Sequence, residues 1–186
     1  MTLQLTGISK SYVSHSLFQD LTLQVGAKSR VGLIGRNGCG KSTLLKIIMG
    51  QETADAGTIY RAPDVRINYL SQEPRITPEL TLDAEMRSVF TALNALAEEE
   101  QALLQKLGSE GQSETQHLST AKRLDFVHRE MERLDARSVD ARIGRILKGL
   151  GFSLADHQRK TGEFSGGWQM RINLAKVLLE GADILL

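Results

Sequence analysis

Short segments of alternating or continuous apolar residues dominate the first seventy positions. Residues 17–25 (L-F-Q-D-L-T-L-Q-V) alternate apolar and polar side chains, which predicts a strand with one buried face. Residues 3–8, 57–61 and 65–70 are further strand candidates, with a turn at Ala62-Pro63-Asp64. The apolar run at 29–34 (S-R-V-G-L-I) predicts a buried strand. We therefore expect β-structure in this part of the chain.

From Thr81 the apolar period changes to three and four residues, which predicts a long amphipathic helix. Its apolar positions are Leu82, Met86, Val89, Phe90, Leu93, Leu96, Ala97, Leu103, Leu104 and Leu107. Residues 108–116 are polar and contain glycine, which predicts a loop. A second helical pattern follows at Leu118, Ala121, Leu124, Val127, Met131 and Leu134. Two long helices joined by a short loop predict an antiparallel helical hairpin, here called the arm.

The last fifty residues predict two more helices and the start of a strand. One helix covers about 139–150 and ends at Gly151, and the other follows residues 164–168 and continues to about 179. Residues 182–186 begin a strand. Together the elements predict an α/β fold with a parallel core, an N-terminal antiparallel β-subdomain and a helical subdomain that bears the arm. We divide this domain into a core at 1–78, the arm at 79–137 and a last part at 138–186.

Composition narrows the class of protein. The 186 residues suit one domain with an appendage, and 23 Lys+Arg against 22 Asp+Glu give no basic bias that would demand nucleic acid. No apolar run is long enough to predict a membrane span, and the N-terminus carries no signal segment, so we expect no membrane insertion. A single cysteine excludes an internal disulfide and suits a reducing compartment, so we expect a cytoplasmic location.

The strongest chemical signal is the run G-R-N-G-C-G-K-S-T at 35–43, which fits G-x-x-x-x-G-K-[ST], the P-loop. The predicted strand at 29–34 and apolar residues at helical spacing in 42–49 would supply the required context. Backbone N–H groups of such a loop bind phosphate oxygens, while the lysine pairs with the β- and γ-phosphates and the serine hydroxyl ligates Mg²⁺. The predicted nucleotide-binding residues are Gly35, Arg36, Asn37, Gly38, Cys39, Gly40, Lys41, Ser42 and Thr43.

A second glycine motif lies at 164–171 (F-S-G-G-W-Q-M-R). Ser165, Gly166 and Gly167 precede a predicted helix and offer a hydroxyl and free N–H groups, as an anion-binding site would. Taken alone, a helix cap with a flexible entry is the simpler interpretation. Together with the P-loop, however, the motif has a more specific meaning.

The two motifs, in this order, resemble the ATP-binding cassette (ABC) family over essentially the whole chain. The resemblance implies that Tyr12 stacks on adenine, that 35–43 is the Walker A loop, and that Gln72 in Y-L-S-Q-E contacts Mg²⁺ and the attacking water as the catalytic Q-loop residue. It also implies that the signature Ser165-Gly166-Gly167 covers the γ-phosphate of a second cassette, in the same parent chain or in a dimer. ATP and Mg²⁺ are the implied cofactors.

A narrower resemblance is to the ABC-F subfamily. The fifth signature position is Trp168, and the chain has G-L-G-F at 149–152. Gln72 and Ser165 are 93 positions apart, more than a compact cassette's helical subdomain requires, and the excess is the helical arm. ABC-F proteins are soluble, carry two cassettes on one chain, and several act on the ribosome, which the arm touches. The alternative is the ATP-binding subunit of an ABC membrane transporter, which needs a groove beside the Q-loop for a coupling helix and usually has no long arm.

The first departure from the family pattern is the end of the sequence. Residues 182–186 (A-D-I-L-L) resemble the opening of the Walker B strand, but the Asp and Glu that follow in the family are not in the sequence, and Asp183 precedes the apolar run. None of the histidines, His15, His117, His128 and His157, follows a buried strand as the family's switch histidine does. We therefore expect the N-terminal part of a larger protein, with marginal solubility and little hydrolysis alone. A catalytically incomplete nucleotide-binding fragment is the third hypothesis.

The second departure is the charge of the arm. Residues 79–137 hold seven Lys+Arg and twelve Asp+Glu, a net charge of −5. An arm that binds RNA phosphates is expected to be basic. The arm is therefore expected to meet protein, or to use local basic residues such as Lys122 and Arg123. A solvated hairpin of mixed charge is the other interpretation.

Overall fold

A computed structural model describes residues 2–12, 15–109 and 113–186. Its contacts group the chain into two compact units. Met1–Leu70 and Gly181–Leu186 form one unit, here called the P-loop unit, and Ser71–Glu180 form the other, here called the helical unit. The division into three parts at 78 and 137 stays a prediction.

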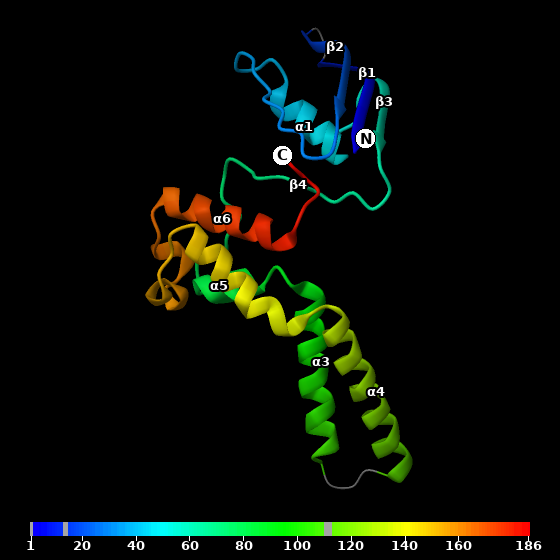
Figure 1. The fold of residues 1–186 in the computed structure, drawn as a ribbon, viewed down its shortest axis with the longest axis vertical. Coiled ribbons are helices and arrows are strands. Elements are labelled where there is room, and N and C mark those ends of the chain that lie inside the picture. Colours follow the sequence, from blue (N-terminus) through cyan, green and yellow to red (C-terminus); the bar gives the residue numbers. More distant parts are fainter. Residues whose placement is uncertain (1, 13–14, 110–112) are drawn as a thin grey trace. The chain divides into compact units, whose positions relative to one another are not determined.

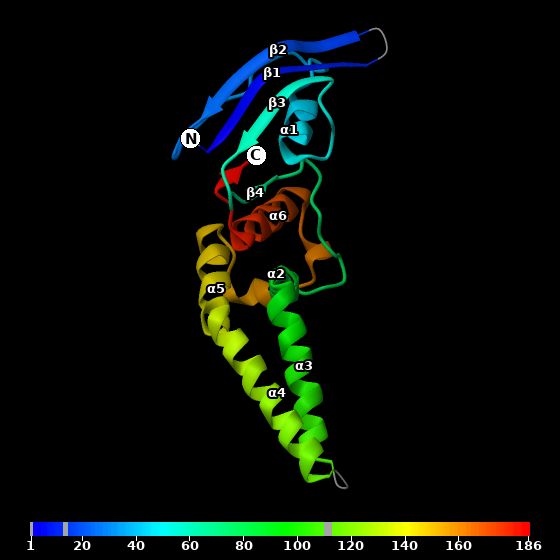
Figure 2. The ribbon, with the colours of Figure 1, turned by 90° about the vertical axis from the view of Figure 1, so that its right-hand side faces the viewer.

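An antiparallel sheet of three strands forms one side of the P-loop unit (Figure 2). Its order is β2-β1-β3, and the strands are β1 (Leu3–Tyr12), β2 (His15–Val25) and β3 (Ala56–Arg61). Leu5 of β1 lies opposite Leu23 of β2 and Ile59 of β3. The predicted strands at 3–8, 17–25 and 57–61 are thereby confirmed.

One helix, α1 (Lys41–Met49), packs against this sheet. Buried Leu3, Leu5 and Ile8 come from alternate or nearly alternate positions of β1 and form one cluster with Leu44 and Ile48 of α1. Full burial of such aliphatic side chains stabilises the fold by about 1.5–3 kcal/mol each. The helix that follows the P-loop is therefore held by its apolar face, which fixes the direction of its N-terminus.

Two short strands form a separate parallel pair in the P-loop unit. β4 (Ile67–Asn68) pairs with β5 (Ile184–Leu185), with Ile67 opposite Ile184. The carboxylate of Asp183 accepts a hydrogen bond from the backbone N–H of Arg66 at 2.9 Å, which fits a polar residue at the entry of a strand. The structure thus contains parallel pairing between segments more than a hundred residues apart, as the α/β prediction requires.

The predicted buried strand at 29–34 is wrong. These residues form no strand among those described, and Ile34 is 96% and Val31 55% exposed. A strand forms only where neighbours pair its N–H and C=O groups, and neither of the two sheets in the described residues includes this segment. The apolar run therefore leads into the P-loop as an irregular, open segment.

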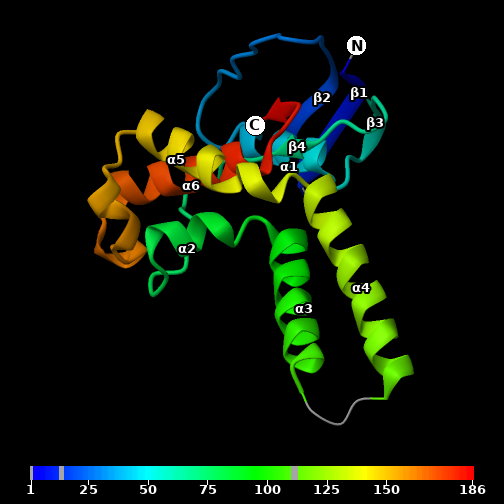
Figure 3. The ribbon, with the colours of Figure 1, turned by 60° about the horizontal axis from the view of Figure 1, so that its bottom comes forward.

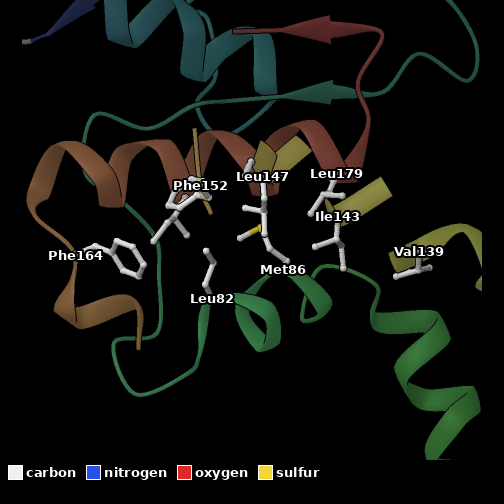
Figure 4. Packing of buried hydrophobic residues seen from close by; sticks show 10 residues of the cluster. Leu82, Met86, Val139, Ile143, Leu147, Phe152, Phe164 and Leu179 are labelled. Carbon is white, nitrogen blue, oxygen red and sulfur yellow. The ribbon is translucent and has the colours of Figure 1, made fainter. Parts of the chain in front are cut away.

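The helical unit contains five α-helices and three short 3₁₀ turns in its described residues (Figure 1). The helices are α2 (Leu82–Arg87), α3 (Thr91–Leu107), α4 (Glu114–Arg133), α5 (Val139–Gly149) and α6 (Gly166–Glu180), and the turns are η1 (Ala136–Ser138), η2 (Leu154–Gln158) and η3 (Thr161–Glu163). Side chains from α2, α5 and α6 point into one core, in which Met86, Leu147 and Leu179 are fully or almost fully buried (Figure 4).

The arm consists of α3 and α4, which lie side by side in all three ribbon views (Figures 1, 2 and 3). Leu103 of α3 and Val127 of α4 are buried, and Arg123 of α4 forms a two-pronged ion pair with Glu99 of α3 at 2.6 and 2.9 Å. The predicted helical hairpin is confirmed. Part of its predicted loop, residues 110–112, lies outside the described residues.

Two boundaries of the arm differ from the prediction. The single helix expected from Thr81 is broken, because α2 ends at Arg87 and α3 begins at Thr91. At the break, Phe90 adopts φ −89° and ψ 55°, and the side-chain amide of Asn94 donates to the Arg87 carbonyl. The break lets Met86 and Phe90 contact one core, so packing overrides the continuous helical period.

The second helix of the arm begins earlier than its apolar pattern suggests. α4 starts at Glu114 because Ser113 and Gln116 form a reciprocal capping box. The side chain of each residue hydrogen-bonds the backbone N–H of the other.

Candidate functional site

The P-loop is a tight turn that depends on glycine. Gly38 and Gly40 have φ of +82° and +93°, a region that side chains with a Cβ rarely adopt. A Cβ on Gly40 would lie 3.0 Å from the Phe18 ring, and a Cβ on Gly35 would lie 2.6 Å from the Cys39 sulfur. Phe18 of β2 and Cys39 of the loop thus leave no space for a side chain at Gly40 and Gly35.

The lysine of the motif folds back across this loop. Its ammonium donates hydrogen bonds to the carbonyl oxygens of Gly35 and Arg36, each at 2.8 Å. The next residue, Ser42, is exposed in the first turn of α1. An ammonium group, a hydroxyl and the free N–H groups of a helix N-terminus therefore meet at one turn, which is the donor set that a polyphosphate requires.

A triphosphate fits these residues, because added Cβ atoms would fill the turn where the backbone must approach the phosphates. Ser42 offers one oxygen of the kind that Mg²⁺ binds. The described part of the chain contains no group of three or more His, Cys, Asp or Glu residues that could hold a metal ion by itself.

Tyr12 lies at the end of β1, in the same unit as the P-loop, and half of its surface is exposed. Its hydroxyl donates to the carboxylate of Glu52, and this hydrogen bond raises the pKa of Tyr12 and lowers the pKa of Glu52. The side chain of Thr43 also hydrogen-bonds Tyr12, with a smaller effect that lowers its pKa. Tyr12 is therefore linked to the last residue of the P-loop.

A lysine completes the surroundings of Tyr12. The Lys10 ammonium lies 5.3 Å from the centre of the Tyr12 ring and pairs with Asp55 at 3.2 Å and Glu52 at 3.5 Å. Hydrogen bonds from the backbone N–H and then the hydroxyl of Ser11 lower the pKa of Asp55. The sequence analysis did not identify Glu52. Its only signal in the sequence was an acidic residue two positions after Gly50, the glycine that ends the P-loop helix.

Gln72 belongs to the helical unit, in a bend, with its side chain exposed. The preceding residue is anchored, because the hydroxyl of Ser71 donates to the Glu73 carbonyl and accepts from the Asn173 amide at 3.4 Å. Its contact with a nucleotide held by the P-loop stays a prediction.

The signature motif opens α6. Ser165, Gly166 and Gly167 are exposed, and no atom lies within 4 Å of the Cβ position of either glycine. Trp168 is half-buried, with its ring edge-on to Phe152 at 4.9 Å and the Arg171 guanidinium over its face at 4.4 Å. Trp168 thus anchors the first turn of the helix, while the three residues before it remain accessible.

A hollow of about 260 Å³ lies beside the motif. Its lining residues are Asp156, Arg159, Glu163, Phe164, Ser165 and Trp168. The pKa of Asp156 is lowered to about 2, first by the Ser153 hydroxyl, then by the Ser153 backbone N–H and by Arg159. The hollow therefore has one carboxylate that stays ionised at all ordinary pH values.

The fold and the P-loop define a nucleotide-binding cassette. The ABC transporter family matches residues 18–186, so the chain belongs to this family. It is 36% identical over 188 residues to ABC transporter F family member 5 of Arabidopsis thaliana. That alignment covers 98% of this chain and 27% of the relative. The chain is 34% identical over 186 residues to the putative ATP-binding protein YdiF of Bacillus subtilis, covering 100% of this chain and 29% of that protein. The chain thus spans little more than a quarter of these relatives.

Solved structures agree with the fold. A putative ABC transporter ATP-binding protein from Pyrococcus furiosus aligns with a TM-score of 0.66 at 19% identity, covering 100% of this chain and 74% of that one. An ATP-binding subunit of an ABC transporter aligns with a TM-score of 0.60 at 24% identity, covering 97% and 62%. The predicted α/β P-loop fold is confirmed. Cassettes of this family bind ATP, typically with Mg²⁺, and work as dimers or paired cassettes. Of the helices in the described ranges, none has the length and apolarity to cross a membrane.

Proposed function

We propose that this chain is the ATP-binding cassette of an ABC-F-type ATPase that acts in translation, in the cytoplasm. The observation that carries the proposal is one combination of features. A P-loop opens α1, an S-G-G-W signature opens α6, and a two-helix arm is inserted between them in the sequence. Similarity to two F family members of Arabidopsis thaliana supports the same assignment.

The P-loop unit binds the nucleotide. The backbone N–H groups of 35–43 hold the phosphates, Lys41 exchanges its carbonyl partners for β- and γ-phosphate oxygens, and Ser42 ligates Mg²⁺. Bound ATP with Mg²⁺ supplies the phosphoryl group that water attacks. Tyr12 stacks on the adenine ring, and the hydrogen bond from its hydroxyl to Glu52 holds the ring in place. By its resemblance to the family's Q-loop glutamine, Gln72 would contact Mg²⁺ and orient the attacking water.

The helical unit serves a second cassette. Ser165 and the N–H groups at the start of α6 cover the γ-phosphate that the partner's P-loop holds, and the open space around Gly166 and Gly167 lets that nucleotide approach. The second cassette lies in the same parent chain or in a second copy. Nucleotide therefore binds between two cassettes and joins them.

The arm meets the ribosome. Its net charge of −5 between residues 79 and 137 favours contact with basic ribosomal protein over RNA phosphate. Exposed Leu104, Leu118 and Phe126 supply apolar contact area on the arm.

A second candidate is the ATP-binding subunit of a membrane transporter. The solved structures with this fold favour it, because their descriptions name transporter cassettes. The arm disfavours it, since a transporter cassette binds a short coupling helix beside the Q-loop and needs no long hairpin. A third candidate, a cassette that binds nucleotide without hydrolysing it, follows if the cassette lacks carboxylates that activate water.

The test compares ATP hydrolysis and ribosome binding in the full protein. Lys41→Ala is expected to reduce hydrolysis at least about tenfold, because it removes the charge that neutralises the phosphates. Lys46→Ala is the matched control, since it removes a lysine from an exposed position of the same helix. Sedimentation with ribosomes should require the arm, so a variant with a shortened α3–α4 hairpin should remain in the supernatant. ATP hydrolysis that is unchanged in Lys41→Ala would contradict the proposed ATPase activity. Unchanged sedimentation of the variant with the shortened hairpin would contradict the proposed role on the ribosome.

A further inference from the structure

A buried ion pair joins two helices of the helical unit. The side chain of Glu85 on α2 is 1% exposed, that of Lys176 on α6 is 20% exposed, and the lysine ammonium donates to the glutamate carboxylate. The other carboxylate oxygen accepts from the backbone N–H of Thr77 at 3.3 Å, and the ammonium also donates to the Arg75 carbonyl at 2.8 Å. Both charged groups therefore bind backbone of the segment that follows Gln72.

Stability alone does not explain this arrangement. Burying a carboxylate and an ammonium group carries a large desolvation penalty, and apolar residues of similar volume are often as stable or more stable. The surrounding core already offers an apolar solution, since Leu82 and Met86 on the same helix are fully buried. What the ion pair adds is directed hydrogen bonds to the backbone at 75 and 77.

Other polar contacts fix the same segment to the region of the signature. The amide of Asn173 on α6 donates to the Ser71 hydroxyl at 3.4 Å. The hydroxyl of Thr161, in η3 just before the motif, donates to the Thr77 carbonyl at 2.6 Å, and Thr161 itself is fully buried. Residues 71–77 are thus attached at both ends to elements that carry or precede Ser165.

We propose that Glu85 and Lys176 are a positioning pair, which fixes the Gln72 segment to the signature helix so that the two motifs move as one rigid body. This inference rests on the proposed function, because it assigns a common support to two motifs of the ATPase. Eleven residues of α6 separate Ser165 from Lys176, a distance of about 16 Å along the helix axis. A displacement of the signature by the partner's nucleotide is therefore transmitted along α6 to the segment that holds Gln72.

The deciding variant is Glu85→Gln with Lys176→Met in the full protein. It removes both charges while keeping the volumes, so the thermal unfolding midpoint should stay near the wild-type value. The hydrogen bonds that place 75–77 are lost or weakened, so kcat for ATP hydrolysis should fall about tenfold or more, with KM unchanged. Lys176→Arg keeps charge and donors and should retain most of kcat. If kcat follows the unfolding midpoint in all these variants, the pair is structural and the proposal is overturned.

Two controls complete the experiment. Arg87→Met with Asp140→Asn removes an exposed ion pair between α2 and α5, whose side chains are 47% and 72% exposed, together with the pair of Arg87 with Asp83. This variant should change neither kcat nor the midpoint. Should the double variant fail to fold, Glu85→Gln alone removes the carboxylate at nearly constant volume and weakens the hydrogen bonds to the Thr77 N–H and the Lys176 ammonium. A kcat that it leaves unchanged overturns the proposal, and a lower kcat at an unchanged midpoint supports it. If the Lys41→Ala variant hydrolyses ATP as fast as the wild type, the proposed function is overturned as well. This measurement distinguishes failure of the proposed function from failure of the positioning pair alone.

Discussion

The P-loop and the signature motif both place glycines at a helix N-terminus, for opposite physical reasons. In the P-loop, Gly38 and Gly40 have positive φ, and a Cβ on Gly40 would collide with Phe18. In the signature, Gly166 and Gly167 have no positive φ and no atom within 4 Å of their Cβ positions. The first motif needs glycine for the backbone it adopts, and the second needs it for the space left in front of it. Under the proposed function, the P-loop glycines shape a turn that binds phosphate, and the signature glycines leave room for the nucleotide of the second cassette.

Gly40→Ala should produce the largest effect. The left-handed conformation costs about 1–2 kcal/mol for a residue with a Cβ, and the new methyl group would lie 3.0 Å from Phe18, so the loop or the ring must shift. We expect ATP affinity to fall at least about tenfold in a direct binding titration. Gly32→Ala is the control, because no atom lies within 4 Å of its Cβ position and its φ is not positive. Equal affinities for the two variants would show that the P-loop glycines are not conformationally required.

Gly167→Ala should lower ATP hydrolysis without lowering the stability of the fold. Alanine within a helix is favoured over glycine by about 0.5–1 kcal/mol, so the unfolding midpoint of the helical unit should stay the same or rise. Hydrolysis should nevertheless fall several-fold, since the methyl group occupies space that the partner's nucleotide needs. Gly144→Ala in α5 also meets open space and should raise stability without loss of activity. A fully active Gly167→Ala variant would remove the distinction between the two motifs.

Acid should produce the smallest effect, at the hollow beside the signature. The folded pKa of Asp156, about 2, lies below its ordinary value of 3.8, so the ionised carboxylate stabilises the fold above that ordinary value. This contribution is lost as pH falls from about 4 through 2. We expect Asp156→Asn to flatten the decrease in urea midpoint over this range, measured by circular dichroism. Identical pH profiles for variant and wild type would contradict the assignment of this pKa.

The local pattern of the sequence was sufficient where one segment buries one face against a neighbour. The alternation in 17–25 predicted β2, and the helical period between Leu93 and Leu134 predicted both helices of the arm. The P-loop and signature could also be located, because their glycines are spaced as phosphate-binding turns require. Such features depend on residues close together in the sequence.

Features that depend on distant partners could not be predicted. The apolar run at 29–34 has the composition of a strand, but no described strand pairs with it. No proline or glycine in the sequence marks the break between α2 and α3, which results from the packing of Phe90 against the core. Glu52 and Glu85 are ordinary acidic residues in the sequence. Their hydrogen bonds with Tyr12 and Lys176 form only because folding brings these distant residues together.

The paired helices of the arm also have a mechanical consequence. The twenty residues of α4 extend about 30 Å, and the ion pair of Arg123 with Glu99 and the hydrogen bond between His128 and Glu100 resist sliding of one helix along the other. A hairpin with these cross-links moves as one rigid body about its base and does not bend along its length. A rotation of about 10° at its base would carry its far end about 5 Å, which is the rise of one helical turn. Small rearrangements where α3 and α4 join the helical core are thereby magnified at the tip.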